Sequence, residues 1–149
     1  MFRKAVLCLY IACLVLVKTI EIPDALIDEV AAACMKEKNF DKAKLSEMFD
    51  DEFHMKYPHD VTSKFMDCAL GKVDFFQEDG AFNREVLTKD LAKALPNFLS
   101  DKIDDKKAAE LANEIYHDCS VPKGESAVEK VANFHNCMIV ELKKKATAV

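Results

Sequence analysis

The sequence contains no tryptophan, and it has only three glycines and four prolines in 149 residues. Residues that break helices are therefore scarce, whereas alanine, lysine, leucine and glutamate are plentiful, which favours an all-α fold. No stretch alternates polar and apolar residues convincingly with the period of two that a half-buried strand requires. The chain also lacks a glycine-rich phosphate-binding loop and an Asn-x-Ser/Thr acceptor for N-linked sugar. These absences argue against glycine-loop nucleotide binding and N-glycosylation.

Long apolar runs are also rare, and the clearest one stands near the start of the chain. Residues 5–17 are thirteen apolar residues, and Arg3 and Lys4 precede them. A helix of this length spans roughly 20 Å, less than the ~30 Å core of a bilayer. We therefore predict a secretory signal peptide at residues 1–19, cleaved near residues 17–20, with an uncleaved anchor as the alternative. The mature chain, residues 20–149, is long enough for one soluble domain.

Cleavage would change both the cysteine count and the charge. Cys8 and Cys13 would leave with the signal, together with Arg3, Lys4 and Lys18, so that 18 basic and 26 acidic residues remain. Such an acidic chain lacks the basic face that nucleic acid requires. The remaining cysteines are Cys34, Cys68, Cys119 and Cys137. In an oxidising compartment they should form two disulfides, with three connectivities possible.

Apolar residues at helical spacing predict six helices in one domain. The first is opened by Pro23 and has an apolar face from Ile27 to Cys34. The others are predicted at residues 41–53, 58–71, 83–95, 104–119 and 125–143. All four remaining cysteines fall on these apolar faces, so their disulfides should join helix to helix. The predicted fold is an all-α bundle of about six short helices.

Residues that could carry catalysis or hold a metal form no convincing set. Glu114-x-x-His117 has the spacing of half a di-iron site, but its only possible counterpart is Asp51-x-x-His54. The cysteines are too far apart for a zinc pair, and no nucleophile or metalloprotease motif is present. We expect a protein that is not an enzyme and has no cofactor or metal site.

Phenylalanine and methionine are abundant in the remaining chain. Nine phenylalanines and five methionines follow the predicted signal. These side chains suit a core that adapts to irregular shapes. Two interpretations stay open: an ordinary core, or a shell around an apolar pocket that binds a hydrophobic small molecule.

The cysteine layout resembles that of the insect odorant-binding proteins, the general odorant-binding and pheromone-binding proteins. Members have six cysteines, with three residues between the second and third and eight between the fifth and sixth. Cys68 matches the third cysteine, which places Lys64 at the second position. Cys137 matches the sixth, which places Val128 at the fifth. Because the second and fifth cysteines pair in the family, one whole bridge is missing, as in the four-cysteine "minus-C" subgroup.

The resemblance implies bridges Cys34–Cys68 and Cys119–Cys137 around an internal apolar pocket. The pocket would bind odorants, pheromones or related lipophilic molecules without changing them, and Tyr116 could offer a hydroxyl to a polar head group. The helical positions that we expect to line it, each of which could equally be plain core, are Ile27, Phe49, Met66, Phe75, Phe76, Leu87, Leu91, Leu95, Tyr116, Phe134 and Met138.

The expected location is extracellular, in sensillar lymph or haemolymph. The expected partners are a small hydrophobic ligand and, as a further candidate, a membrane chemoreceptor, with the carrier a monomer or weak homodimer. The alternative is a secreted helical signalling or interaction protein without a cavity. Ligand binding should weaken between about pH 7 and about pH 5, with His135 as the responsible group, unless the histidines are uncoupled from the pocket.

Overall fold

The computed structural model describes residues 20–99 and 102–147. Over these residues the chain forms six α-helices and one 3-10 helix, and its β-structure is limited to two isolated bridges. The prediction of an all-α fold of six helices with two disulfides is confirmed. The predicted signal peptide, residues 1–19, lies outside the described residues.

Four of the described α-helices, α2, α3, α5 and α6, begin after an aspartate or asparagine whose side chain caps them. Asp28, Asp41 and Asp104 each accept a hydrogen bond of 2.7 Å from a backbone N–H three residues later. The elements are the 3-10 helix η1 (Asp24–Leu26) and the α-helices α2 (Glu29–Lys38), α3 (Lys42–Ser46), α4 (Asp60–Leu70), α5 (Arg84–Phe98), α6 (Asp105–Cys119) and α7 (Ala127–Thr147).

The helix predicted at residues 41–53 is much shorter than expected. Helix α3 ends at Ser46, and the chain then forms a loop, residues 47–59, before α4. The Asp50 carboxylate accepts hydrogen bonds of 2.9 Å from the N–H groups of Glu52 and His54, which stabilises a turn in place of a helix. Phe53 has a left-handed backbone with φ of 67°, which a continuing helix could not accommodate.

Other helix boundaries also differ from the prediction, including the end of α7 at Thr147 instead of residue 143. After Pro23 the chain forms only the short η1, and α2 begins after Asp28. Helix α5 does not stop before Pro96 but continues to Phe98. Proline lacks one backbone donor, but the last turn is still closed, because the Leu99 N–H donates to the Leu95 carbonyl at 3.1 Å.

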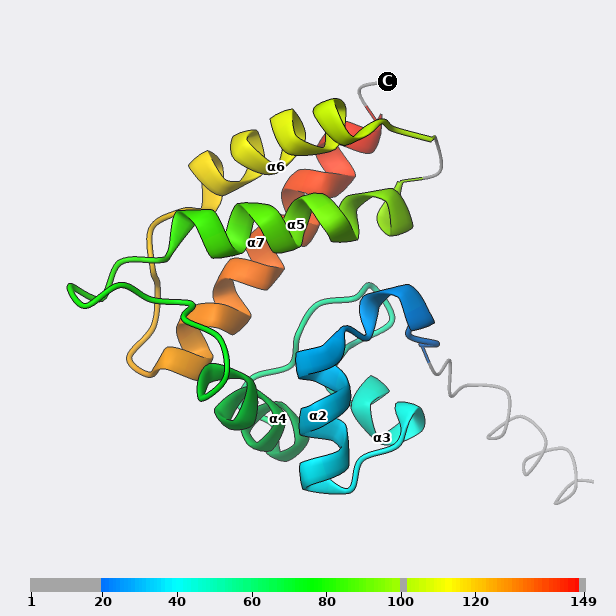
Figure 1. Ribbon diagram of the computed structural model, residues 1–149, viewed down its shortest axis with the longest axis vertical. Coiled ribbons are helices and arrows are strands. Elements are labelled where there is room, and N and C mark those ends of the chain that lie inside the picture. The colour runs from blue at the N-terminus through cyan, green and yellow to red at the C-terminus, as the bar shows by residue number, and fades with distance from the viewer. Residues whose placement is uncertain (1–19, 100–101, 148–149) are drawn as a thin grey trace, which may run out of the picture.

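The helices form two groups that α7 connects (Figure 1). Helices α5 and α6 run antiparallel along each other, and α7 packs against α6 and extends to the α4 end of the molecule. Helix α2 packs on α4, with α3 beside them. The Cys34–Cys68 disulfide joins α2 to α4, and Cys119–Cys137 joins α6 to α7. These are the pairs that the family resemblance implied.

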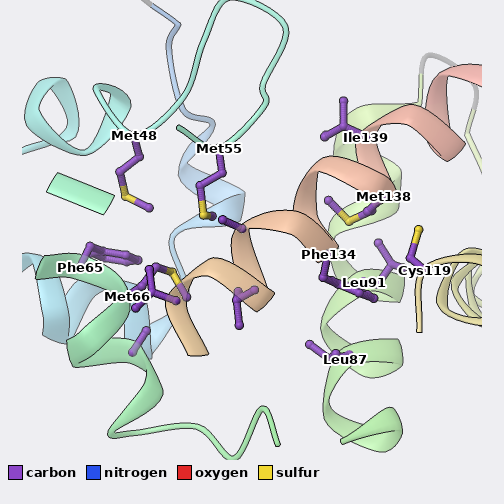
Figure 2. Packing of buried hydrophobic residues seen from close by; sticks show 14 of the residues in the cluster. Met48, Met55, Phe65, Met66, Leu87, Leu91, Cys119, Phe134, Met138 and Ile139 are labelled. Atoms are coloured by element: carbon purple, nitrogen blue, oxygen red, sulfur yellow. The ribbon is translucent and has the colours of Figure 1, made fainter. Parts of the chain in front are cut away.

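The buried side chains form one core that reaches both groups of helices (Figure 2). Within it, Met48, Met55, Phe65 and Met66 lie on the side of the 47–59 loop and α4, and Leu87, Leu91, Cys119, Phe134, Met138 and Ile139 lie toward α5, α6 and α7. The 47–59 loop, α4, α5 and α7 meet between these two sides of the core, and a hollow lies there.

Candidate functional site

An apolar pocket of about 220 Å³ lies between the N-terminal segment, the 47–59 loop and helices α4, α5 and α7. Eleven of its twelve lining side chains are apolar, and the remaining one is an imidazole. The lining consists of Ile22, Leu26, Ala31, Leu45, Met48, Phe49, Phe53, Phe65, Ala94, Phe98, His135 and Met138. We call this hollow the apolar pocket.

Aromatic rings form much of the pocket wall. The ring centroid of Phe49 lies 5.9 Å from that of Phe53 and 5.4 Å from the imidazole of His135. Phe53 in turn meets Phe98, the last residue of α5, edge to face at 5.8 Å. These contacts lie within the range at which aromatic pairs attract each other. The rings therefore support one another around the hollow.

Helix α7 holds the 47–59 loop in place through two neighbouring side chains. The Asn136 amide donates to the Met55 carbonyl at 3.0 Å, and its carbonyl oxygen accepts from the Met55 N–H at 2.7 Å. His135 Nε2 lies 2.8 Å from the Phe53 carbonyl oxygen. A carbonyl oxygen can only accept, so Nε2 carries the hydrogen. These bonds fix the backbone that presents Phe49 and Phe53 to the pocket.

Two carboxylates of the 47–59 loop, Asp50 and Glu52, also take part in interactions that hold the loop. Burial raises the pKa of Asp50, but hydrogen bonds from the backbone of His54 and Glu52 outweigh it, and the net pKa is lowered. A hydrogen bond from Lys143 lowers the pKa of Glu52 and ties the loop to the end of α7. Burial lowers the pKa of His135, so its ring is neutral at pH 7.

The predicted ligand-binding residues are not all at this pocket. Phe49 and Met138 are on its lining. Three more are sequence neighbours of lining residues, one position away: Ile27 follows Leu26, Met66 follows Phe65 and Leu95 follows Ala94. Neighbouring residues of an α-helix point about 100° apart, so Met66 on α4 and Leu95 on α5 face the buried core instead. Ile27, which follows η1, is partly buried against that core.

The other predicted residues lie toward α5, α6 and α7. Leu87 and Leu91 are buried on α5, and Phe75 is partly buried against the core. The remaining three surround Phe82, whose ring centroid lies 5.2 Å from Phe76 and 5.1 Å from Phe134, with Tyr116 6.3 Å from Phe134. We call Phe76, Phe82, Phe134 and Tyr116 the closed ring cluster. The Tyr116 hydroxyl donates to the Phe82 carbonyl at 3.4 Å.

Several lining residues were missed by the sequence reasoning. Leu45 and Met48 fall in or just after α3, Phe53 belongs to the loop, and Phe98 lies beyond the proline that was expected to end α5. Helical periodicity cannot place Met48 and Phe53, because residues 47–59 form a loop, and Phe98 lies in a turn of α5 beyond its predicted end. The signal that the sequence does offer for these positions is the aromatic side chains themselves, Phe49, Phe53 and Phe98.

The weak metal motif considered above does not form a site. Glu114 is ion-paired with Lys145, and the His117 side chain is 88% exposed. Across residues 20–99 and 102–147, no group of three or more acidic, histidine or cysteine side chains could hold a metal ion. A second hollow, of about 180 Å³, lies beside the Cys119–Cys137 bridge, but Asp118, Lys123 and Asn133 contribute to its lining. The apolar pocket is therefore the better site for a hydrophobic ligand.

A family model described as the PBP/GOBP family matches residues 22–141. The chain belongs to the PBP/GOBP family. The match includes all four disulfide cysteines and every residue that lines the apolar pocket. No curated protein sequence and no solved structure matches the chain significantly. The minus-C assignment within the family stays a prediction.

Membership of the PBP/GOBP family supports a coarse role and location for this chain. The family comprises secreted binding and carrier proteins for small ligands, rather than enzymes. None of the described helices combines the length and the apolar character needed to cross a bilayer. The apolar pocket is the candidate site for binding a small ligand.

Proposed function

We propose that this PBP/GOBP protein is a secreted carrier that holds a small hydrophobic molecule in the apolar pocket and releases it unchanged. Odorants, pheromones and related lipophilic compounds are the expected ligands, in sensillar lymph or haemolymph. The observation that supports the proposal is the pocket itself, a hollow of about 220 Å³ with eleven apolar lining residues. Pockets for hydrophobic small molecules have this character.

The energetic argument depends on apolar contact. Transferring a small hydrocarbon from water into the pocket removes apolar surface, worth about 25 cal/mol per Å². No lining side chain is positioned as a nucleophile, and no metal or cofactor is needed for such binding. A delivery partner, such as a membrane chemoreceptor, and a monomeric or weakly dimeric state belong to the same proposal.

The absence of tryptophan gives a direct test. A Phe98→Trp variant would place a single tryptophan on the pocket wall, and Phe76→Trp would place one in the closed ring cluster as a matched control. Titration with small volatile hydrocarbons should change the emission of Phe98→Trp saturably and leave Phe76→Trp nearly unchanged. A panel of compounds that changes neither variant would contradict the carrier role.

The alternative is a secreted helical interaction protein whose apolar residues serve only its own core. Native mass spectrometry of the purified protein distinguishes the two. A copurified small apolar molecule supports the carrier, whereas a bare chain that also ignores every compound in the tryptophan assay supports the interaction protein.

A further inference from the structure

The volume of the apolar pocket sets how much of a ligand it can enclose. A cavity of about 150 Å³ with a similar aliphatic and aromatic lining binds benzene. The apolar pocket, at about 220 Å³, therefore has room for a benzene ring with about three further carbon atoms. A long-chain lipid would leave much of its chain outside this hollow.

The lining favours rings over flexible chains. Phe53 contacts both Phe49 and Phe98 beside the hollow, and Phe65 adds a further ring from α4. Favourable ring pairs attract each other beyond what their buried area contributes. The sulfur atoms of Met48 and Met138, on opposite sides of the view in Figure 2, add contacts that also favour aromatic partners.

Charged ligands have no partner on this surface. The lining contains no lysine, arginine, aspartate or glutamate. Its one polar side chain, His135, already donates its Nε2 hydrogen to the Phe53 carbonyl. The other nitrogen of a neutral ring can accept a hydrogen bond but cannot donate one. A carboxylate in the pocket would therefore lose its water without gaining a donor, which is costly.

We infer that the apolar pocket selects compact, uncharged molecules built on one aromatic ring with about three further carbon atoms, and excludes long-chain lipids and carboxylates. The inference rests on the proposed carrier function and narrows its ligand class.

The test uses the mature chain labelled with ¹³C at its methionine methyl groups, followed by NMR. Met48 and Met138 line the pocket, whereas the buried Met66 does not and serves as an internal control. The compounds are isopropylbenzene, isopropylcyclohexane, 4-isopropylbenzoate and hexadecan-1-ol. Isopropylbenzene should shift the Met48 and Met138 signals saturably and leave Met66 nearly unchanged.

The other compounds test each part of the inference. Isopropylcyclohexane should bind more weakly than isopropylbenzene after each association constant is divided by the compound's water-to-alkane partition coefficient. This division removes the difference in general hydrophobicity between the two compounds. 4-Isopropylbenzoate at pH 7.5 should bind at least tenfold more weakly, because burying its charge is costly. Hexadecan-1-ol should not shift Met48 and Met138 together.

A larger side chain on the lining tests whether the ligand binds in the apolar pocket. Ala94→Leu, on the lining, should weaken isopropylbenzene binding by about 10–200-fold, since hydrophobic pockets discriminate small volume changes by this amount. Ala92→Leu, partly buried on the same helix but not on the lining, should bind normally. A thermal melt of both variants checks that they fold.

The outcomes separate the inference from the carrier function. Saturable binding of hexadecan-1-ol at Met48 and Met138, or equal binding of the benzoate, overturns the ligand class and leaves the carrier function standing. Binding of isopropylbenzene that shifts Met66 alone places the site elsewhere and also overturns the inference. If none of the compounds binds and no small molecule copurifies, the carrier function itself fails.

Discussion

Phe134 and His135 are neighbours on α7, yet they belong to two different groups of rings. Phe134 packs in the closed ring cluster, where Phe82 is only 2% exposed. His135 belongs to the wall of the apolar pocket with Phe49 and Phe53. The two groups have similar composition, but the closed ring cluster packs around Phe82, with only Phe134 bordering the hollow of about 180 Å³, whereas the pocket rings border about 220 Å³.

The backbone explains this difference. Phe76 and Phe82 face each other across an isolated β-bridge, and their rings stack at an interplanar angle of 24°. In the pocket, Phe53 comes from a loop residue with φ of 67° and Phe98 from a helix end. Side chains from regular, directly opposed backbone can interdigitate closely. Phe49 also lies on an isolated bridge, but its partner there is Met55 and not a ring, and the irregularly placed Phe53 and Phe98 complete the wall of the hollow.

The largest expected effect separates the two groups by stability. Phe82→Ala should lower the free energy of unfolding by about 3–5 kcal/mol, because it removes a fully packed ring from the core. Phe49→Ala should cost less, about 1–2 kcal/mol, since Phe49 is half-buried and already borders a hollow. Urea unfolding of both variants measures the difference, and equal losses would contradict the division into a closed and an open group.

The two groups of rings differ in how well they could be predicted from the sequence. The apolar spacing on α6 and α7, and the four cysteines on helix faces, were enough for the helical fold, and the family resemblance implied the bridges. Periodicity selected Phe134, because a buried ring on a regular helix follows it. It could not find Phe53, whose place depends on a turn formed by the Asp50 side chain and on a tertiary bond from His135.

A third disulfide between α4 and α7 should stabilise the side of the molecule that contains the apolar pocket, because both helices contribute to its lining. If Lys64 and Val128 occupy the positions of the missing cysteines, their Cα atoms lie within roughly 7 Å. Lys64 is exposed and pairs with Asp60 at 2.9 Å, so its removal leaves no buried charge. Lys64→Cys with Val128→Cys should raise stability by up to about 4 kcal/mol in the loop-entropy relation, although engineered bridges often give less.

The oxidised and reduced forms of this double variant are each other's control. Oxidation should slow ligand exchange in the pocket, because Phe65 on α4 and Met138 on α7 both line it. Melting curves, with a thiol count by mass spectrometry, measure the gain. Free thiols at both positions under oxidising conditions, or a bridge that forms only by scrambling the native pairs, would show that the six-cysteine alignment is wrong.

A smaller effect should follow from loosening the loop. Asn136→Ala removes the side chain that binds both backbone groups of Met55, which should cost about 1–3 kcal/mol. Asn133→Ala, also on α7, removes one exposed bond to the Lys123 carbonyl and should cost less. Hydrogen exchange should increase in residues 47–59 only for Asn136→Ala. Unchanged exchange there would mean that other contacts hold the loop.

The smallest expected effect is on pH dependence, and it concerns His135 alone. Burial lowers its pKa, while its charged neighbours act in opposite directions, since His54 lowers the pKa and Asp50 raises it. A histidine with a lowered folded pKa binds protons more readily when unfolded, so folding stability should fall as the pH drops below about 6.5. A hydrocarbon in the pocket would exclude more water and favour the neutral ring further.

Binding of isopropylbenzene, which does not titrate, should therefore weaken as the pH falls from about 7 to about 5. His135→Gln should remove this dependence, because its amide does not titrate and can still donate toward the Phe53 carbonyl. His117→Asn is the control, since the His117 side chain is 88% exposed and lies away from the pocket lining. Equal affinities across this pH range for the unmodified protein would show that His135 is not coupled to the ligand. A dependence that survives His135→Gln would point to another group.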